Sequence, residues 1–457
     1  MEITQALQKQ RAFWNSGKTL DLGFRAAALK KLKQAVVGAK PQIDAALKAD
    51  LNKSAAEGFL CEIALVLEEI QYMQKHLRKL AKPERVGASL FQFPAKAWVE
   101  KCPFGCVLIM SPWNYPFLLT LEPLVDAIAA GNTAVLKPSA LAPRTSAVIQ
   151  KLIESIFPPE YVHVVCGGRE ENKQLLEQPF DLIFFTGGKT VGKIVMESAA
   201  KHLTPVVLEV GGKSPCIIDR TADIALAAKR IAFGKFLNAG QTCVAPDYLL
   251  FHPAVKAEFI RCFEKSVRQL YCENPLQNED YVRIVNAKHF ERLCGLLKGE
   301  TVVFGGQRDE KTLKIAPTLL DHVQPDAPVM QEEIFGPILP MLECDSLDAA
   351  AQFILSRPRP LALYLFTNDQ KAVETIKSLP FGGGCVNDTI MHLTSSRLPF
   401  GGIGESGMGH YHGRYGFDAF THKKAMLYKP KAFDMQVRYP PYRDGGMLKW
   451  LQKRLLK

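Results

Sequence analysis

The middle of the chain alternates short apolar runs with helical patterns, and this alternation constrains the fold more than any other feature of the sequence. Runs of four or five mostly apolar residues have the length of buried strands, and the apolar residues between them recur at helical spacing. Such an alternation predicts a mostly parallel, doubly wound α/β sheet. The predicted strands are 106–110, 133–136, 162–165 and 182–185, with a helix at 143–156.

A second stretch of the same kind follows the apolar run 206–209. Its predicted helices cover 225–237 and 257–270, and its predicted strands lie near 301–304, 338–342 and 361–366.

The first eighty residues predict helices instead. One apolar stripe ends before Pro83, and residues 88–100 then have a strand-like composition that suggests a projecting hairpin. The stripe consists of Leu60, Ile63, Leu67, Ile70, Met73 and Leu77.

The length and composition of the chain limit the classes of protein to which it can belong. The chain of 457 residues is too long for one compact core, so two or three domains are expected. A hydrophobic content of 47% and a charged content of 23% are typical of soluble globular proteins. The net charge of +11 could attract anionic ligands or only reflect a solvated basic surface. The basic residues are spread along the chain, which argues against nucleic-acid binding.

Cysteine usage indicates the compartment. Eleven cysteines cannot all pair, so a complete disulfide framework is excluded and a reducing compartment is expected. The N-terminus lacks the pattern of a signal peptide, and no apolar stretch is long enough to span a membrane. We therefore expect a cytoplasmic protein.

The sequence predicts no metal site. Cys102 and Cys106 lack a second Cys/His pair, and His410 and His412 lack acidic or cysteine neighbours at ligand spacing.

Cys243 follows a polar, loop-like stretch, residues 240–242. The other ten cysteines are interpreted as small buried hydrophobes. A polar loop can lower the pKa of a thiol, and the thiolate is strongly nucleophilic toward a carbonyl carbon. Cys243 could therefore act as a nucleophile toward a carbonyl carbon.

Two polar residues could complete this chemistry. Glu209 ends a predicted strand beside Gly211 and Gly212, where it is either a solvated strand end or a base whose pKa is raised by partial burial. Asn114 is either a turn former or an amide that donates to an oxyanion together with the backbone N–H of Cys243.

Glycines mark a candidate dinucleotide site. Gly187, Gly188 and Gly192 lie where a predicted strand ends and a helix begins, so the backbone could approach a pyrophosphate there. Ile183 occupies the first glycine position of a Walker motif, so a phosphate loop of that kind is rejected. Residues 402–407 match the dinucleotide fingerprint formally, but no βαβ unit surrounds them.

Four segments together resemble the aldehyde dehydrogenase superfamily: 111–116, 208–215, 236–246 and 332–337. They follow the order of the superfamily over nearly the whole chain. Residues 407–413 and 439–442 further resemble the class 3, or fatty, aldehyde dehydrogenases.

The resemblance assigns roles to individual residues. Cys243 becomes the nucleophile, Glu209 the general base and Asn114 the oxyanion donor. The expected cofactor is NAD or NADP, held by Lys137, Ser139, Gly187, Gly188, Gly192, Glu333, Phe335 and Trp113. Lys137 matches the lysine that contacts the adenosine ribose, and Glu333 and Phe335 match the pair at the nicotinamide ribose and ring. The superfamily usually has Ser where Gly188 stands, so one pyrophosphate contact is expected to be missing.

The resemblance also implies an α/β fold with three parts. We expect a Rossmann-like cofactor domain at 1–82 and 103–208, a catalytic domain at 209–415 and a small β oligomerisation flap at 83–102 and 416–442. Residues 443–457 form a basic tail in which Met447, Leu448, Leu451 and Leu455 share one face of a helix. This tail could pack on the protein or lie at the periphery of an anionic membrane.

The implied activity is NAD(P)-dependent oxidation of a medium- or long-chain aliphatic or aromatic aldehyde by a homodimer. An acyl-transferring relative that uses coenzyme A is one alternative, but such enzymes usually lack the equivalent of Glu209. A non-catalytic structural use of the fold is the other, and the presence of every candidate catalytic side chain argues against it.

Overall fold

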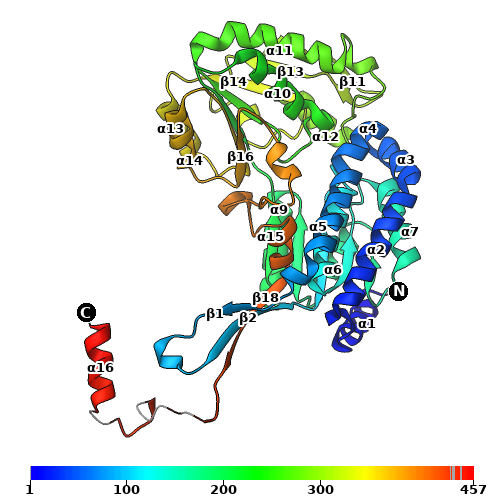
Figure 1. The fold of residues 1–457 in the computed structure, drawn as a ribbon. Helices are drawn as coiled ribbons and strands as arrows, with labels where there is room; N and C mark the ends of the chain where they lie inside the picture. The colour runs from blue at the N-terminus through cyan, green and yellow to red at the C-terminus, as the bar shows by residue number, and fades with distance from the viewer. Residues whose placement is uncertain (1, 433, 435–437, 443–444, 457) are drawn as a thin grey trace. The chain divides into compact units, whose positions relative to one another are not determined.

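The computed structural model describes residues 2–432, 434, 438–442 and 445–456, which divide into two units (Figure 1). The larger unit runs to Leu80 and continues over Pro103–His422, and the smaller unit comprises Ala81–Cys102 and the residues from Lys423 onward. In Figure 1 the larger unit has two lobes, one blue to cyan and the other green to yellow.

The helices predicted in the first eighty residues are present. They belong to the first lobe. One π-helical turn, Phe59–Ile63, interrupts them before the last helix, which ends at Leu80 ahead of Pro83. The helices are α1 (Ile3–Asn15), α2 (Leu22–Gly38), α3 (Lys40–Leu51), α4 (Ala55–Gly58) and α5 (Ala64–Leu80).

A six-stranded sheet forms the centre of this lobe, in the order β17-β7-β6-β3-β4-β5. Its strands are β3 (Cys106–Met110), β4 (Thr133–Lys137), β5 (Val162–Val164), β6 (Leu182–Thr186), β7 (Val206–Glu209) and the antiparallel edge strand β17 (Gly407–Met408). All but β17 are parallel to their neighbours, and every residue of β3, β4 and β6 is buried, as in a sheet covered by helices on both faces. The connecting helices are α6 (Leu118–Ala130), α7 (Pro143–Ile156), α8 (Arg169–Leu176) and α9 (Lys189–Ala200).

The second lobe contains a seven-stranded sheet in the order β10-β13-β14-β9-β8-β15-β16. Its strands are β8 (Pro215–Ile218), β9 (Tyr248–Phe251), β10 (Thr301–Phe304), β13 (Thr318–Asp321), β14 (Ile338–Glu343), β15 (Ala362–Phe366) and β16 (Gly383–Val386), and only β10 is antiparallel to its neighbour. The helices are α10 (Ile224–Phe236), α11 (Lys256–Tyr271), α12 (Ala287–Leu296), α13 (Leu347–Leu355) and α14 (Gln370–Lys377), and a small ladder joins β11 (Arg308–Asp309) to β12 (Lys314–Ile315).

The predicted strand–helix alternation is confirmed in both lobes, and most predicted bounds differ by one residue or none. The glycine-rich stretch 402–407 does not begin a long helix: it contains a short 3₁₀ turn, Gly404–Ser406, and its last residue begins β17. The next helix is α15 (Gly413–Ala419). The proposed division into cofactor and catalytic domains stays a prediction.

The smaller unit is a three-stranded sheet with a terminal helix. β1 (Glu84–Val86) pairs antiparallel with β2 (Lys96–Pro103), and β18 (Thr421–Tyr428) lies on the other side of β2. A hairpin is therefore present, but the predicted range 88–100 was wrong for its first strand, which lies entirely before residue 88. The C-terminal helix is α16 (Gly446–Leu455).

Candidate active site

Loops from the carboxyl edge of the six-stranded sheet carry most of the predicted site residues. In the parallel register, Met110 of β3 lies opposite both Lys137 and Phe185, and Thr186 lies opposite Glu209. Residues 111–114, 138–139, 187–188 and 209–212 therefore leave the sheet at one edge, where open α/β sheets bind their ligands.

Cys243 follows a turn with unusual backbone geometry. Asn238 and Ala239 have left-handed φ values of 55° and 51°, and Gly240 follows with a φ of 74°. Only glycine fits at position 240, because a Cβ atom there would lie 2.3 Å from the carbonyl oxygen of Gly336. The turn thus fixes where the nucleophile loop begins.

The thiol of Cys243 is half-buried. Burial raises its pKa above the ordinary value, and the nearby carboxyl groups of Glu333 and Glu209 raise it further. The backbone N–H groups of Cys243 and Val244 have the opposite effect. The fold therefore brings together a thiol and two carboxyl groups that lie far apart in the sequence.

Glu209 ends β7 and is only 3% exposed. Neither carboxyl oxygen has a hydrogen-bond partner among the described residues, and burial raises its pKa well above the ordinary value. A desolvated carboxyl group without partners has the properties of a general base that works near neutral pH.

Asn114 is buried, and its Nδ2 donates to the carbonyl oxygen of Gln241 at 3.0 Å. A carboxamide has two N–H donors, so the second remains for another acceptor. Through Gln241, the amide is held two residues from Cys243. The predicted role of Asn114 as an oxyanion donor needs such a free N–H close to the nucleophile.

The predicted pyrophosphate site fits a dinucleotide. Gly188 is the N-cap of α9, no side chain caps the helix, and its first turn has no acidic residue. Its backbone N–H groups can therefore donate hydrogen bonds to an anion. A Cβ atom at Gly192 would lie 2.7 Å from Val210, so this glycine permits close packing of the helix on the strand end.

Lys137 lies buried at the end of β4, and its Nζ donates to the carbonyl oxygens of Gly167 at 2.8 Å and Pro138 at 3.0 Å. Burial lowers its pKa. Ser139 accepts a hydrogen bond from the N–H of Leu141 at 3.2 Å. Both residues lie at the sheet edge where the resemblance places the adenosine ribose.

Glu333, Phe335 and Trp113 come together from distant segments. The Trp113 and Phe335 rings meet edge to face with centroids 5.4 Å apart. Burial raises the pKa of Glu333 to about 8, and its Oε1 is buried without a partner among the described residues. A Cβ atom at Gly211 would lie 2.7 Å from the Glu333 carboxylate, so the glycine leaves space for this side chain.

Sequence reasoning missed the buried residues that support this site. Lys53 and Glu62 form a fully buried ion pair, and Tyr115 shares a hydrogen bond of 2.6 Å with Thr242. No local pattern marks these residues, because each acquires its role through a partner far away in the chain.

His412 has an acidic neighbour after all, but from another element. It is buried, and its Nε2 lies 3.4 Å from the carboxyl group of Glu122 on α6. Burial lowers the pKa of His412 to about 3, so the ring is neutral and the contact is structural. Within the described part of the chain, no three His, Cys, Asp or Glu side chains are placed to hold a metal ion.

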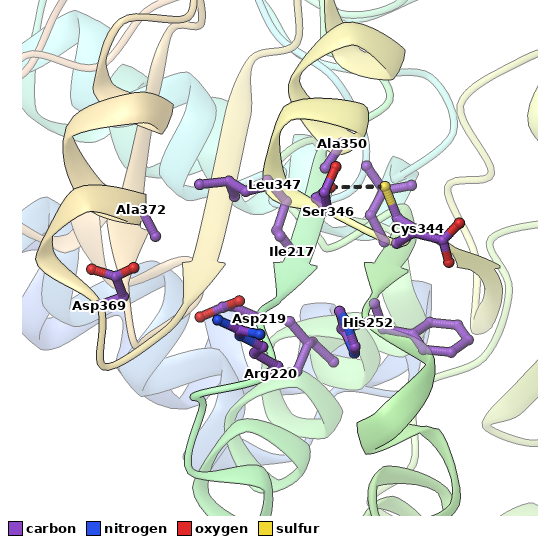
Figure 2. Close-up of a pocket in the computed structure, with 14 residues that line it drawn as sticks. Ile217, Asp219, Arg220, His252, Cys344, Ser346, Leu347, Ala350, Asp369 and Ala372 are labelled. Atoms are coloured by element: carbon purple, nitrogen blue, oxygen red, sulfur yellow. Dashed lines mark hydrogen bonds between the residues drawn. The ribbon is translucent and has the colours of Figure 1, made fainter.

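A separate cavity of about 320 Å³ lies at the carboxyl ends of β8, β9 and β14 (Figure 2). Asp219, Arg220, His252 and Asp369 lie around it. None of the predicted site residues lines it. The loops of Cys243 and Glu209 lead into the opposite, amino ends of β9 and β8, so this cavity is distinct from the candidate active site.

Comparison with known proteins decides the family. The model of the aldehyde dehydrogenase family matches residues 1–426. The chain belongs to the aldehyde dehydrogenase family. The 4,4'-diaponeurosporen-aldehyde dehydrogenase of Staphylococcus aureus is 49% identical over 98% of both chains. A solved structure described as the substrate-bound state of Staphylococcus aureus AldH has a TM-score of 0.97, 49% identity and complete coverage of both chains.

Relatives in other organisms indicate the class of aldehyde dehydrogenase that this chain resembles. A dog aldehyde dehydrogenase named dimeric and NADP-preferring is 42% identical over 96% of this chain and 98% of its own. Several further relatives are named as members of aldehyde dehydrogenase family 3. These findings confirm the predicted class 3 resemblance and the α/β fold of this aldehyde dehydrogenase. The protein is an oxidoreductase that oxidises an aldehyde with NAD or NADP.

Proposed function

We propose that this aldehyde dehydrogenase converts an apolar aldehyde to the carboxylic acid through a thioester on Cys243. The convergence of Cys243, Glu209 and Asn114 from three distant segments carries the proposal. Overall, one aldehyde, one water and one oxidised cofactor give one carboxylic acid, one reduced cofactor and one proton.

Each residue has one task in this sequence of steps. Cys243 adds its sulfur to the carbonyl carbon, and the Asn114 amide and the Cys243 N–H donate to the oxygen that becomes negative. When bound, the nicotinamide supplies the oxidant that turns the thiohemiacetal into a thioester. Glu209 then removes a proton from water, whose oxygen attacks the thioester and releases the acid and the Cys243 thiol.

The residues present fit the cofactor. The free N-terminus of α9 and Gly187, Gly188 and Gly192 would hold the pyrophosphate, with Lys137 and Ser139 at the adenosine ribose. Glu333 would accept hydrogen bonds from the hydroxyl groups of the nicotinamide ribose. Trp113 and Phe335 would border the nicotinamide ring.

The substrate class is medium- and long-chain aliphatic or aromatic aldehydes. The resemblance to fatty aldehyde dehydrogenases supports this substrate class. The Staphylococcus aureus relative is named as a dehydrogenase of 4,4'-diaponeurosporen-aldehyde. Steady-state kcat/KM across aldehydes of graded chain length tests this proposal, and we expect the value to rise with chain length. A strong preference for acetaldehyde would contradict it.

We infer that the protein acts as a homodimer in the cytoplasm. The dog relative named dimeric supports the oligomeric state. In the smaller unit, β18 is an edge strand with exposed Met426, Leu427 and Tyr428, a surface suited to contact with a second copy.

Coenzyme A dependence separates the proposed reaction from acyl transfer. We expect carboxylic acid and reduced cofactor in equal amounts without coenzyme A, and no acyl-coenzyme A when it is added. Formation of acyl-coenzyme A would favour the transferase instead.

Cys243→Ala tests the nucleophile. We expect this variant to bind NAD(P)H as the parent does and to form no reduced cofactor in a single turnover. Detectable formation would contradict the assignment, and a variant that forms acid at the parental rate would leave only a structural role for the thiol.

A further inference from the structure

Lys53 and Glu62 form an ion pair whose two side chains are fully buried, with Nζ and Oε1 2.6 Å apart. Burial of two charges has a large desolvation penalty unless their remaining hydrogen-bonding capacity is satisfied. Lys53 follows α3, and Glu62 lies in the π-helical turn Phe59–Ile63. Such turns are rare and occur frequently at functional sites.

The pair holds the backbone of the segment that contains Asn114. Lys53 Nζ also donates to the carbonyl oxygen of Asn114 at 2.8 Å and lies 4.0 Å from the centre of the Tyr115 ring. Glu62 Oε2 accepts from the N–H groups of Phe117 at 2.8 Å and Leu118 at 3.3 Å. Both ends of the segment are thus held by one buried pair.

The same segment contacts the nucleophile loop at two further points. Asn238 Nδ2 donates to the Asn114 carbonyl oxygen at 2.9 Å and to that of Gln241 at 3.1 Å. The Tyr115 hydroxyl and the Thr242 Oγ1 are 2.6 Å apart, directly before Cys243. Through these contacts the Asn114 segment lies directly against the nucleophile loop.

We propose that Lys53 and Glu62 are positioning residues that set the Asn114 amide relative to Cys243. The proposal rests on the oxyanion role of Asn114 proposed above. Both side chains bond to backbone groups of this segment, at the Asn114 carbonyl oxygen and at the N–H groups of Phe117 and Leu118, so they act through that backbone. A misplacement of about 1 Å at such a site can slow a reaction about a hundredfold.

The direct test uses Lys53→Met, which keeps the length of the side chain without its charge. Single-turnover formation of reduced cofactor from octanal should be about tenfold to a hundredfold slower. The dissociation constant of NADH, measured by fluorescence, should stay within about twofold, because the pair has no predicted contact with the cofactor. Lys256→Met is the matched control: its ion pairs with Asp321 and Glu343 lie in the second lobe, and its rate should remain parental.

A double-mutant cycle distinguishes positioning from general stability. In an Asn114→Ala background, Lys53→Met should slow the single turnover by less than about threefold, because the amide that it positions is already gone. If Lys53→Met has its full effect there, or none in the parent, the pair is only structural and the inference is wrong. If Asn114→Ala alone does not slow the turnover, the oxyanion assignment itself fails.

The double variant Lys53→Met/Glu62→Gln replaces the ion pair by two uncharged side chains, so no unpaired charge is left buried. We expect it to fold, to show a thermal midpoint close to that of the parent, and to remain slow in single turnover. Parental speed in this variant would overturn the proposal even if Lys53→Met by itself does not fold.

Discussion

At the scale of single residues, burial shifts the titration of the reactive groups of the site toward their protonated forms. Burial and two carboxyl groups raise the pKa of Cys243, while burial raises the pKa of Glu209 and of Glu333. A thiol in such surroundings is a poor nucleophile. The bound cationic nicotinamide ring would favour the thiolate by adding positive charge.

Glu333→Gln tests this electrostatic coupling. Removal of the carboxylate should lower the pKa of Cys243, so iodoacetamide should alkylate the cofactor-free enzyme faster at about pH 8, where Glu333 is partly ionised. Alkylation of Cys243 can be followed by mass spectrometry. Glu332→Gln, at the exposed neighbouring position, is the control and should not change the rate. A slower reaction in Glu333→Gln would contradict the coupling.

Glu209→Gln should stop the enzyme at the thioester. Oxidation of the thiohemiacetal needs no base at this position, whereas hydrolysis does, so rapid quench should show a burst of reduced cofactor followed by slow turnover. In the parent, turnover should rise with pH as Glu209 loses its proton, and the raised pKa moves this rise to higher pH. The rise should be absent in the variant. Loss of the burst itself would place Glu209 at another step.

At the scale of elements, the order of parallel strands assembles the cofactor site. Lys137 ends β4, and the loop from Ser139 to Ala142 leads into α7. Ala140 is exposed in this loop. An alanine there can neither accept a hydrogen bond from the ribose hydroxyls, as a carboxylate could, nor repel a 2′-phosphate.

We therefore expect kcat/KM for NADP to lie within about tenfold of that for NAD, a difference of about 1.4 kcal/mol in transition-state stabilisation. Ala140→Glu should shift the preference toward NAD, and Ala140→Gln, which has the same size without charge, should shift it less. A preference of about a hundredfold for NAD in the parent would refute this prediction.

At the scale of the whole molecule, the C-terminal helix α16 leaves large hydrophobic side chains exposed. Leu451 of α16 is buried, whereas Leu455 is 59% exposed and Trp450 48% exposed. The side chain of Met447 and all of Lys457 lie outside the described residues. None of the helices in the described part is both long and apolar enough to cross a membrane. A basic amphipathic helix can lie on an anionic membrane surface or pack on protein.

Vesicle binding distinguishes these alternatives. If α16 binds membranes, the full chain should co-sediment with anionic vesicles at low salt and dissociate at high salt, because screening weakens the attraction of its basic residues. A chain truncated after Tyr442 should not sediment. Equal binding by both chains, or binding by neither, would leave packing on the protein as the explanation.

The sequence by itself determined the order of the elements and predicted which residues react. Apolar runs such as residues 106–110 predicted β3 because a strand buried on both faces must be apolar throughout. Cys243, Glu209 and Asn114 were recognisable because each lies in a short motif. Only the tertiary structure decided what surrounds them. The raised pKa of Glu209 depends on complete desolvation, and the role inferred for Lys53 depends on an oxygen of Asn114 sixty-one residues away. Burial and long-range hydrogen bonds are properties of the packed chain, so no local pattern could reveal them.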